Sequence, residues 1–228
     1  MRPTIAIGDV HGLTFWKSAV EESEGKRIVF LGDYLDPYQY IPDRELLENL
    51  EEIIRLKMER PEQVILLLGN HDLHYISELA GRCRRYNLSI SDDAGKLFRG
   101  HAGCFQIAYQ DGDVLFTHAG VSQDWFETDF GGMPDREVAN QLNYPNDGQR
   151  AALYRAGECR GGERGKIGGP LWLDRREATN PLHGYTQVVG HTRMPHVTDC
   201  RYGNANRIFF CDSLFNGNYW DSDRHLSD

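Results

Sequence analysis

The sequence lacks a long apolar segment and a recognisable leader. Its longest candidate apolar run, Val64 to Leu68, is far too short to cross a bilayer. The first residues, Met1 to Thr4, lead directly into an apolar strand pattern and do not have the layout of a signal peptide. We therefore expect a cytoplasmic protein that does not bind a membrane.

Paired cysteines are also missing. The chain has 5 cysteines, an odd number, and no two of them have C-x-x-C spacing. This argues against a disulfide framework and against a zinc site made of cysteines, and it favours a reducing compartment.

Positive charge is scarce as well. The 25 lysines and arginines are outnumbered by 34 aspartates and glutamates, which gives a formal net charge of -9. That balance disfavours stable binding to nucleic acid, which requires basic surface. It is compatible with an anionic substrate, because bound divalent ions can reverse the potential inside a cleft.

The first third of the sequence alternates strand and helix patterns. Three short apolar runs are typical of buried strands: Ile5–Ile7, Arg27–Leu31 and Val64–Leu68. Helical patterns extend between them, from about Leu13 to Ser23 and from Asp43, the expected N-cap, to a stop near Pro61. Strands that alternate with helices predict βαβ units and a parallel sheet.

The later half predicts a second sheet. Phe105–Tyr109 and Val114–Thr117 flank a turn and are typical of a β-hairpin, and strands return at Gln187–Val189 and Arg207–Phe210. Residues 121–160 have a mostly helical, polar pattern. We expect an α/β fold in which two packed mixed β-sheets are flanked by helices, formed as a single domain by residues 1–228.

A stretch rich in glycine and charge covers residues 160–169. It lacks the strand–GxxxxGK[ST]–helix context of a phosphate-binding loop. We interpret it as a mobile surface loop that serves as a lid or contacts the substrate.

Five short segments share one design, in which an apolar strand runs into a turn that carries metal-binding side chains. They are Gly8-Asp9-Val10-His11-Gly12, Gly32-Asp33-Tyr34-Leu35-Asp36, Gly69-Asn70-His71-Asp72, Thr117-His118-Ala119-Gly120 and Gly190-His191-Thr192. Strand ends are rigid places from which ligands can be directed into a shared cleft. Carboxylate, amide and imidazole groups suit manganese, iron, zinc or similar ions. A carboxylate such as Asp33 can bridge two of them.

In this order, the five motifs resemble the calcineurin-like metallophosphoesterases, and most of all their phosphoprotein phosphatase and bacterial diadenosine tetraphosphatase branch. The resemblance extends from Ile5 to about Val197. It implies a four-layer α/β/β/α fold and two divalent ions, with manganese preferred and iron, zinc, cobalt or nickel as alternatives. The implied metal ligands are Asp9 and His11 for the first ion, Asp33 as the bridge, and Asn70, His118 and His191 for the second. His71 is the implied general acid, positioned by Asp36 or Asp72.

Two departures from the family pattern narrow this expectation. Arg193 stands where some diesterase members have a second histidine, which favours the phosphoprotein phosphatase type of site. Pro37, however, follows Asp36 where that type has an arginine that binds phosphate with two hydrogen bonds. In the segment of residues 170–176, Arg175 or Arg176 could supply the missing cation, with Arg175 preferred.

These features predict a dinuclear metal-dependent hydrolase of phosphate esters, first of all a phosphomonoesterase of the serine/threonine-phosphatase-like type. Its substrate would be a phosphorylated small molecule, nucleotide or phosphoprotein. The alternative is a phosphodiesterase or a dinucleoside-polyphosphate pyrophosphohydrolase. A non-catalytic scaffold of the same fold is disfavoured, because all the implied ligands and His71 are present.

The remaining titratable groups are expected to have no catalytic role. We interpret His74 as a packed or surface residue and His101 as a loop histidine. His183 and His196 are expected to be exposed or to give indirect support, and His225 to have no specific role in a polar tail. Asp212, which follows a strand, is interpreted as structural.

Overall fold

The central strands form from short runs of β-branched, aliphatic and aromatic residues that bury both faces. A computed structural model describes residues 2–78, 80–134, 137–203 and 206–226 and arranges these strands in two five-stranded sheets. The first sheet has the order β10-β1-β2-β3-β4 and the second has the order β5-β6-β7-β9-β8. The strands are β1 (Thr4–Ile7), β2 (Arg27–Phe30), β3 (Val64–Leu67), β4 (Phe105–Gln106), β5 (Ala108–Asp111), β6 (Val114–Thr117), β7 (Thr186–Arg193), β8 (Thr198–Tyr202), β9 (Asn206–Asp212) and β10 (Trp220–Asp221).

Each sheet is mixed, as the sequence predicted. In the first, β1 to β4 run parallel and β10 is antiparallel to β1. In the second, β6, β7 and β9 run parallel, whereas β5 and β8 are antiparallel edge strands. The parallel pairing of β1, β2 and β3 confirms the expected βαβ units.

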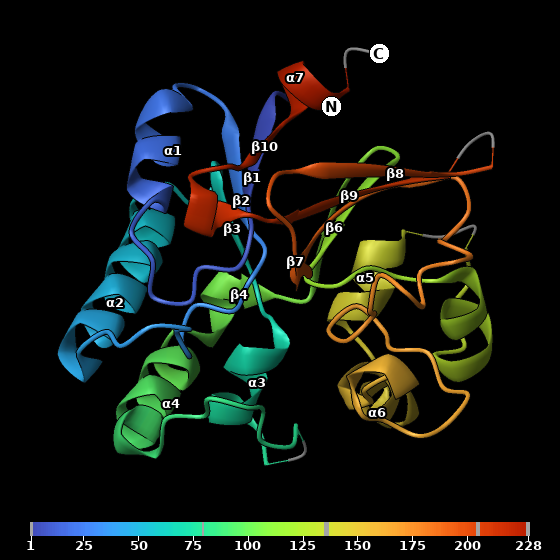
Figure 1. The fold of residues 1–228 in the computed structure, drawn as a ribbon, viewed down its shortest axis with the longest axis horizontal. Coiled ribbons are helices and arrows are strands. Elements are labelled where there is room, and N and C mark those ends of the chain that lie inside the picture. Colours follow the sequence, from blue (N-terminus) through green and yellow to red (C-terminus); the bar gives the residue numbers. More distant parts are fainter. Residues whose placement is uncertain (1, 79, 135–136, 204–205, 227–228) are drawn as a thin grey trace.

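Helices cover the outer faces of the sheets. The helices are α1 (Trp16–Glu22), α2 (Asp43–Glu59), α3 (Asn70–Ile76), α4 (Ser91–Gly100), α5 (Val138–Asn143), α6 (Asp147–Tyr154) and α7 (Ser222–His225). Figure 1 shows α1, α2 and α4 along one side of the first sheet, and α5 and α6 on the opposite side of the molecule. Within the described residues, no helix is long and apolar enough to cross a membrane.

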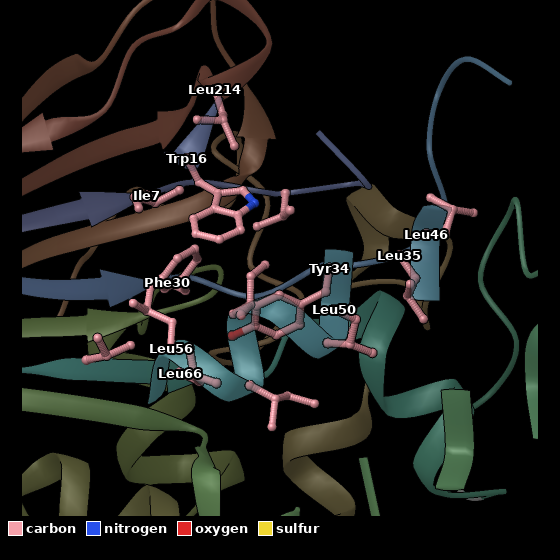
Figure 2. Close-up of a cluster of buried hydrophobic side chains, with 14 of the residues drawn as sticks. Ile7, Trp16, Phe30, Tyr34, Leu35, Leu46, Leu50, Leu56, Leu66 and Leu214 are labelled. Atoms are coloured by element: carbon pink, nitrogen blue, oxygen red, sulfur yellow. The ribbon is translucent and has the colours of Figure 1, made fainter. Parts of the chain in front are cut away.

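Several apolar layers hold the sheets in place, and one of them packs Leu115 of β6 against Leu142 of α5 and Leu153 of α6. Figure 2 shows the layer between the first sheet and its helices, where Trp16 of α1 and Leu50 of α2 pack near Phe30 and Tyr34. Another layer joins the two sheets and includes Val29 and Leu67 from the first sheet and Phe116 and Phe209 from the second. The two sheets therefore pack face to face, so that residues at their strand ends can meet across the seam.

Three expected boundaries were wrong. The segment expected as one strand, residues 105–109, divides into β4, which pairs with β3, and β5, which forms the hairpin with β6. Pro42, not Asp43, is the N-cap of α2, and the Asp43 carboxylate instead accepts hydrogen bonds from Asn87 and Ser89. The helix expected from about residue 13 begins only at Trp16.

The segment of residues 121–160 was expected to be mostly helical. It contains a short π-helix (Trp125–Asp129), α5, α6 and a 3-10 turn (Glu158–Arg160), joined by irregular backbone. Residues 135–136 of this segment lie outside the described residues.

Candidate metal centre

The five predicted segments converge at the seam between the two sheets. Two of them are not the turns expected: residues 70–72 begin α3, and residues 190–192 lie within β7, where its register shifts. The five segments bring together two groups of potential ligands, Asp9–His11–Asp33 and Asp33–His118–His191, and the ligand atoms within each group lie within 4.8 Å of one another. Asp33 belongs to both groups. We call Asp9–His11–Asp33 the first cluster and Asp33–His118–His191 the second cluster. Asn70 adds its amide to the second cluster.

In the first cluster, hydrogen bonding leaves His11 ready to bind a cation. Its Nδ1 lies 2.7 Å from the carbonyl oxygen of Leu35 and therefore donates its hydrogen there. Nε2 is then a bare acceptor, and it lies 3.8 Å from Asp9 Oδ2 and 3.7 Å from Asp33 Oδ2. Three acceptors that face one another without a hydrogen between them indicate a place for a cation.

The second cluster has the same character. His118 Nδ1 lies 2.8 Å from the Leu31 carbonyl oxygen, so its Nε2 is again the free acceptor. That Nε2 lies 3.0 Å from Asn70 Oδ1, 3.0 Å from His191 Nδ1 and 3.6 Å from Asp33 Oδ2. The Asn70 amide is oriented by its nitrogen, which donates to the Cys83 sulfur at 3.3 Å.

Burial sets the protonation of both clusters. It raises the pKa of Asp9 and of Asp33 well above the ordinary aspartate value, with neighbouring carboxylates adding to the effect. It also lowers the pKa of His11 and of His118 to about 3, which leaves both rings neutral at physiological pH. Divalent ions bind neutral imidazoles and ionised carboxylates, and two such ions would supply the positive charge that these crowded carboxylates lack, so the donor set fits a pair of them.

The backbone at the site is held in unusual conformations. Five described residues other than glycine have positive φ: His11 (43), Asp33 (53), Asp36 (60), Arg85 (67) and His191 (60). All five lie in or beside the metal centre. Glycines allow close approach there, since a Cβ on Gly69 would lie 2.1 Å from Asp33 Oδ1 and one on Gly190 would lie 2.3 Å from Asp9 Oδ1. Strained backbone gathered in this way is typical of a functional site.

His71, the expected general acid, lies beside the first cluster and is bound by Asp36. Its Nδ1 is 2.7 Å from Asp36 Oδ2, and its ring centroid is 5.3 Å from that of His11. Burial would raise the pKa of Asp36, but hydrogen bonds from His71, His74 and Tyr75 hold it below the ordinary value. Burial lowers the pKa of His71, while Asp36 opposes that shift.

Two neighbours of His71 have roles other than those expected. Asp72 does not contact His71, because its carboxylate accepts hydrogen bonds from the backbone N–H groups of Asp33, Tyr34 and Gly69 at 2.7–2.9 Å. It braces the turn that carries the bridging ligand. His74 is buried as expected, but its Nε2 lies 2.9 Å from Asp36 Oδ2, which makes it part of the support for His71.

A cleft of about 570 Å³ opens over both clusters. Besides His71, Tyr38, Trp172 and all the expected ligands except His118, its lining includes four arginines: Arg82, Arg84, Arg85 and Arg160. Sequence reasoning missed Arg82, Arg84 and Arg85, whereas Arg160 begins the stretch of residues 160–169 that was expected to cover or contact the substrate. Arg85 lies nearest to the expected acid: its Nε donates to the Asp36 carbonyl oxygen at 2.9 Å, and Nη2 is 3.5 Å from His71 Nε2. Its guanidinium also lies 3.8 Å from the centre of the Tyr38 ring.

The arginines expected to contact phosphate are directed elsewhere. Among the described residues, those that line the cleft include neither Arg175 nor Arg176. Arg176 pairs with Asp174 at 2.8 Å, and Arg175 is exposed with its guanidinium 5.9 Å from the Phe210 ring centre.

The other histidines mostly take the minor roles expected. His101 ends α4, with its Nδ1 2.9 Å from the Leu97 carbonyl oxygen, and His183 contacts Asn180 on the surface. His196 is exposed. His225, expected to have no specific role, lies in α7 and stacks on Trp220 with ring centroids 6.1 Å apart.

Two buried donor clusters that share one carboxylate, at the seam of two mixed sheets and under an arginine-lined cleft, define a metal-dependent phosphoester hydrolase. Residues 2–206 match the family model described as calcineurin-like phosphoesterase, and the chain belongs to that family.

Solved structures with the same fold include phosphatases. One is a cold-active protein-tyrosine phosphatase from a psychrophilic Shewanella, with 18% identity and a TM-score of 0.57, over 93% of this chain and 71% of that one. Another is a protein serine/threonine phosphatase from Saccharomyces cerevisiae, with 15% identity and a TM-score of 0.54, over 92% of this chain and 67% of that one. At this identity the likeness establishes the shared fold.

Proposed function

We propose that the protein hydrolyses phosphate monoesters with two divalent metal ions, in the manner of the serine/threonine phosphatases. The observation that carries the proposal is the position of Asp33, whose Oδ2 lies 3.7 Å from His11 Nε2 and 3.6 Å from His118 Nε2. One carboxylate between two neutral imidazoles suits a bridge between two cations. When bound, the ions would neutralise charge on the phosphoryl oxygens and supply hydroxide near neutral pH.

His71 gives a proton to the leaving oxygen of the ester. Asp36 holds the ring through Nδ1, so Nε2 is the atom that faces the cleft. A bound phosphate places negative charge beside this ring and raises the pKa of His71, which offsets the lowering caused by burial. The protonated form is therefore available in the complex with substrate.

Arg85 contacts the phosphate in place of the arginine that Pro37 excludes. Its guanidinium lies in the cleft, 3.5 Å from His71 Nε2, and is fixed through Nε by the Asp36 carbonyl oxygen. A guanidinium anchored at Nε still presents its two terminal nitrogens, the groups that bind two phosphoryl oxygens at once.

The preferred ion is manganese, and the expected location is the cytoplasm.

A second candidate function is hydrolysis of a diester or a pyrophosphate bond, as in a dinucleoside polyphosphate. The four arginines of the cleft favour it, since they offer more positive charge than a single phosphate group requires.

The test is an assay of the purified protein on an aryl phosphomonoester and the matching aryl phosphodiester, with manganese added. We expect the monoester to be hydrolysed faster at equal concentration. A clear preference for the diester, or for a dinucleoside polyphosphate in a parallel assay, would favour the second candidate. Absence of turnover with manganese, iron, zinc, cobalt and nickel would contradict both.

A further inference from the structure

The end of strand β9 lies against the metal centre. Asp212 is its last residue, and the register pairs it with Arg193 of β7. Gly8, in the first ligand turn, permits a close approach, because a Cβ there would lie 2.1 Å from the Cys211 carbonyl oxygen and 2.9 Å from the Asp212 Cα. This approach places Asp212 beside the turn that carries Asp9, in a position where the sequence predicted only a structural role.

The carboxylate of Asp212 is buried and incompletely paired. The residue is 3% exposed, and its Oδ2 has no hydrogen-bond partner among the described residues. A buried carboxylate oxygen without a partner costs free energy that native structures normally avoid. The oxygen therefore requires a donor or a cation.

A small hollow provides room for that partner. Its volume is about 20 Å³, and its polar lining consists of Asp9, His11, Tyr38, Gln39, Arg193 and Asp212. That volume holds about one water molecule, which needs roughly 10–15 Å³ when counted in the same way. Arg193 covers the hollow, with its guanidinium 3.9 Å from the Phe215 ring centre and 4.5 Å from that of Tyr38.

Electrostatics link Asp212 to the first cluster. Asp9 and Asp212 both line the hollow, so two buried carboxylates share this small space. Two carboxylates that repel each other in a buried space indicate a missing positive charge between or beside them.

The first cluster also leaves room for a further ligand. Asp9, His11 and Asp33 give a first cation three protein ligands, and Arg193 stands where a second histidine would provide another. Divalent ions of this class take four to six ligands, so water must complete the set.

We propose that Asp212 holds a water molecule in this hollow against the cation bound by Asp9 and His11, and thereby orients and tightens the first metal site. Asp212 is thus a positioning residue that acts through water. This inference rests on the proposed two-metal function.

The experiment measures manganese binding by the full-length protein after metal removal, using the electron paramagnetic resonance signal of free Mn²⁺. We expect Asp212→Asn to bind two ions at saturating manganese, as the wild type does, but with one dissociation constant raised roughly tenfold or more. Asp212→Ser, which removes the charge and leaves extra space for water, should show the same weakening and provides a second test if the first variant folds poorly.

Asp221→Asn is the matched control. Asp221 is another buried strand-end carboxylate, but it pairs with Lys26 at 2.8 Å and does not line the hollow. We expect this control to melt at a lower temperature and to bind manganese like the wild type. Without manganese, Asp212→Asn should melt no lower than the wild type, because it removes a charge that repels Asp9.

Several results would overturn the inference. Unchanged manganese affinity in both Asp212 variants would show that the carboxylate does not act on the cation, and loss of one ion at saturation would make Asp212 a direct ligand. Equal weakening in Asp221→Asn, or strong destabilisation of metal-free Asp212→Asn, would indicate a general effect of a lost buried charge. Failure of the proposed function would look different: the wild type would bind two ions and hydrolyse no phosphoester, or would not bind two ions at all.

Discussion

The two ligand clusters are assembled in different ways. The first cluster comes entirely from the first sheet, from turns that follow the neighbouring strands β1 and β2. The second takes Asp33 and Asn70 from the first sheet but His118 and His191 from the second. The protein ligands of the first cation therefore come from one parallel strand pair, whereas those of the second come from both sheets. A cation in the second cluster would fasten the sheets together.

Asp33→Asn should have the largest effect, because it removes the one ligand common to both clusters. We expect activity to fall on the order of 10⁴-fold or more, since two bound ions contribute several kcal/mol of charge stabilisation. Turnover of an aryl phosphomonoester and the number of manganese ions bound at saturation would measure this. A variant that still bound two ions and retained a tenth of the activity would contradict the bridging role.

Separating the clusters requires a pair of variants, His11→Gln and His118→Gln. Each should lose one ion and lower kcat/KM roughly 10³-fold, because the remaining ion stabilises only part of the charge. Saturating manganese should raise Tm less in both variants than in the wild type. The reduction should be larger in His118→Gln than in His11→Gln, because only the second cation joins the two sheets. Equal losses of this thermal shift would show that the second site does not fasten the sheets.

His71→Asn addresses a group outside both clusters. We expect kcat to fall roughly 10²-fold or more through loss of proton donation, with both manganese ions retained. The loss should be smaller for an ester whose leaving group is a weak base, because that group needs less protonation. An equal loss for esters with good and poor leaving groups would remove His71 from this role.

Arg85→Ala tests whether an arginine in the cleft lining, and not Arg175, binds the phosphate group of the substrate. We expect kcat/KM for a phosphomonoester to fall about tenfold through loss of a charge-assisted contact, and inorganic phosphate to inhibit more weakly. Arg175→Ala is the matched control and should change kcat/KM less than about twofold, in line with its exposed position. The reverse order of effects would restore the assignment made from the sequence.

The smallest of these effects is expected for Asp36→Asn, and it is measured as a change in the free energy of unfolding. At pH 7 we expect the free energy of unfolding to fall by about 1 kcal/mol, because hydrogen bonds from His71, His74 and Tyr75 weaken. Since the pKa of Asp36 is lowered in the folded protein, its contribution is present above the ordinary aspartate pKa and is lost as pH falls through the folded value. The difference from wild type should therefore shrink below about pH 4 in urea unfolding experiments. A difference that stayed constant with pH would contradict this.

The ligands could be predicted from the sequence because each lies in or directly after a short apolar segment with a strand pattern. Asp9 and Asp33 follow neighbouring strands of one parallel sheet, so local pattern and that sheet determine where they meet. His118 follows β6 of the second sheet and reaches them only because the two sheets pack together. The same reasoning could not choose between Asp36 and Asp72 as the partner of His71. Only the fold decides that Asp72 turns toward backbone N–H groups while Asp36 faces the ring.

Contacts between distant loops could not be predicted. Arg85 reaches Asp36 across 49 residues of sequence, from a segment without strand or helix periodicity. Its left-handed backbone, with φ of 67, is unusual for arginine and gives no sign in the sequence. Asp212 is similar, because its position depends on how closely β9 approaches Gly8 in another sheet.

The left-handed backbone at His11, Asp33, Asp36, Arg85 and His191 has a consequence for laboratory evolution. Each such residue costs about 1–3 kcal/mol that glycine at the same position would largely recover. Libraries screened only for heat resistance should therefore accumulate glycine at positions 11, 33, 85 and 191, whereas Asp36 should be kept for the hydrogen bonds that its carboxylate accepts. Selection for thermal stability alone would therefore remove metal ligands and abolish activity while it raised the melting temperature.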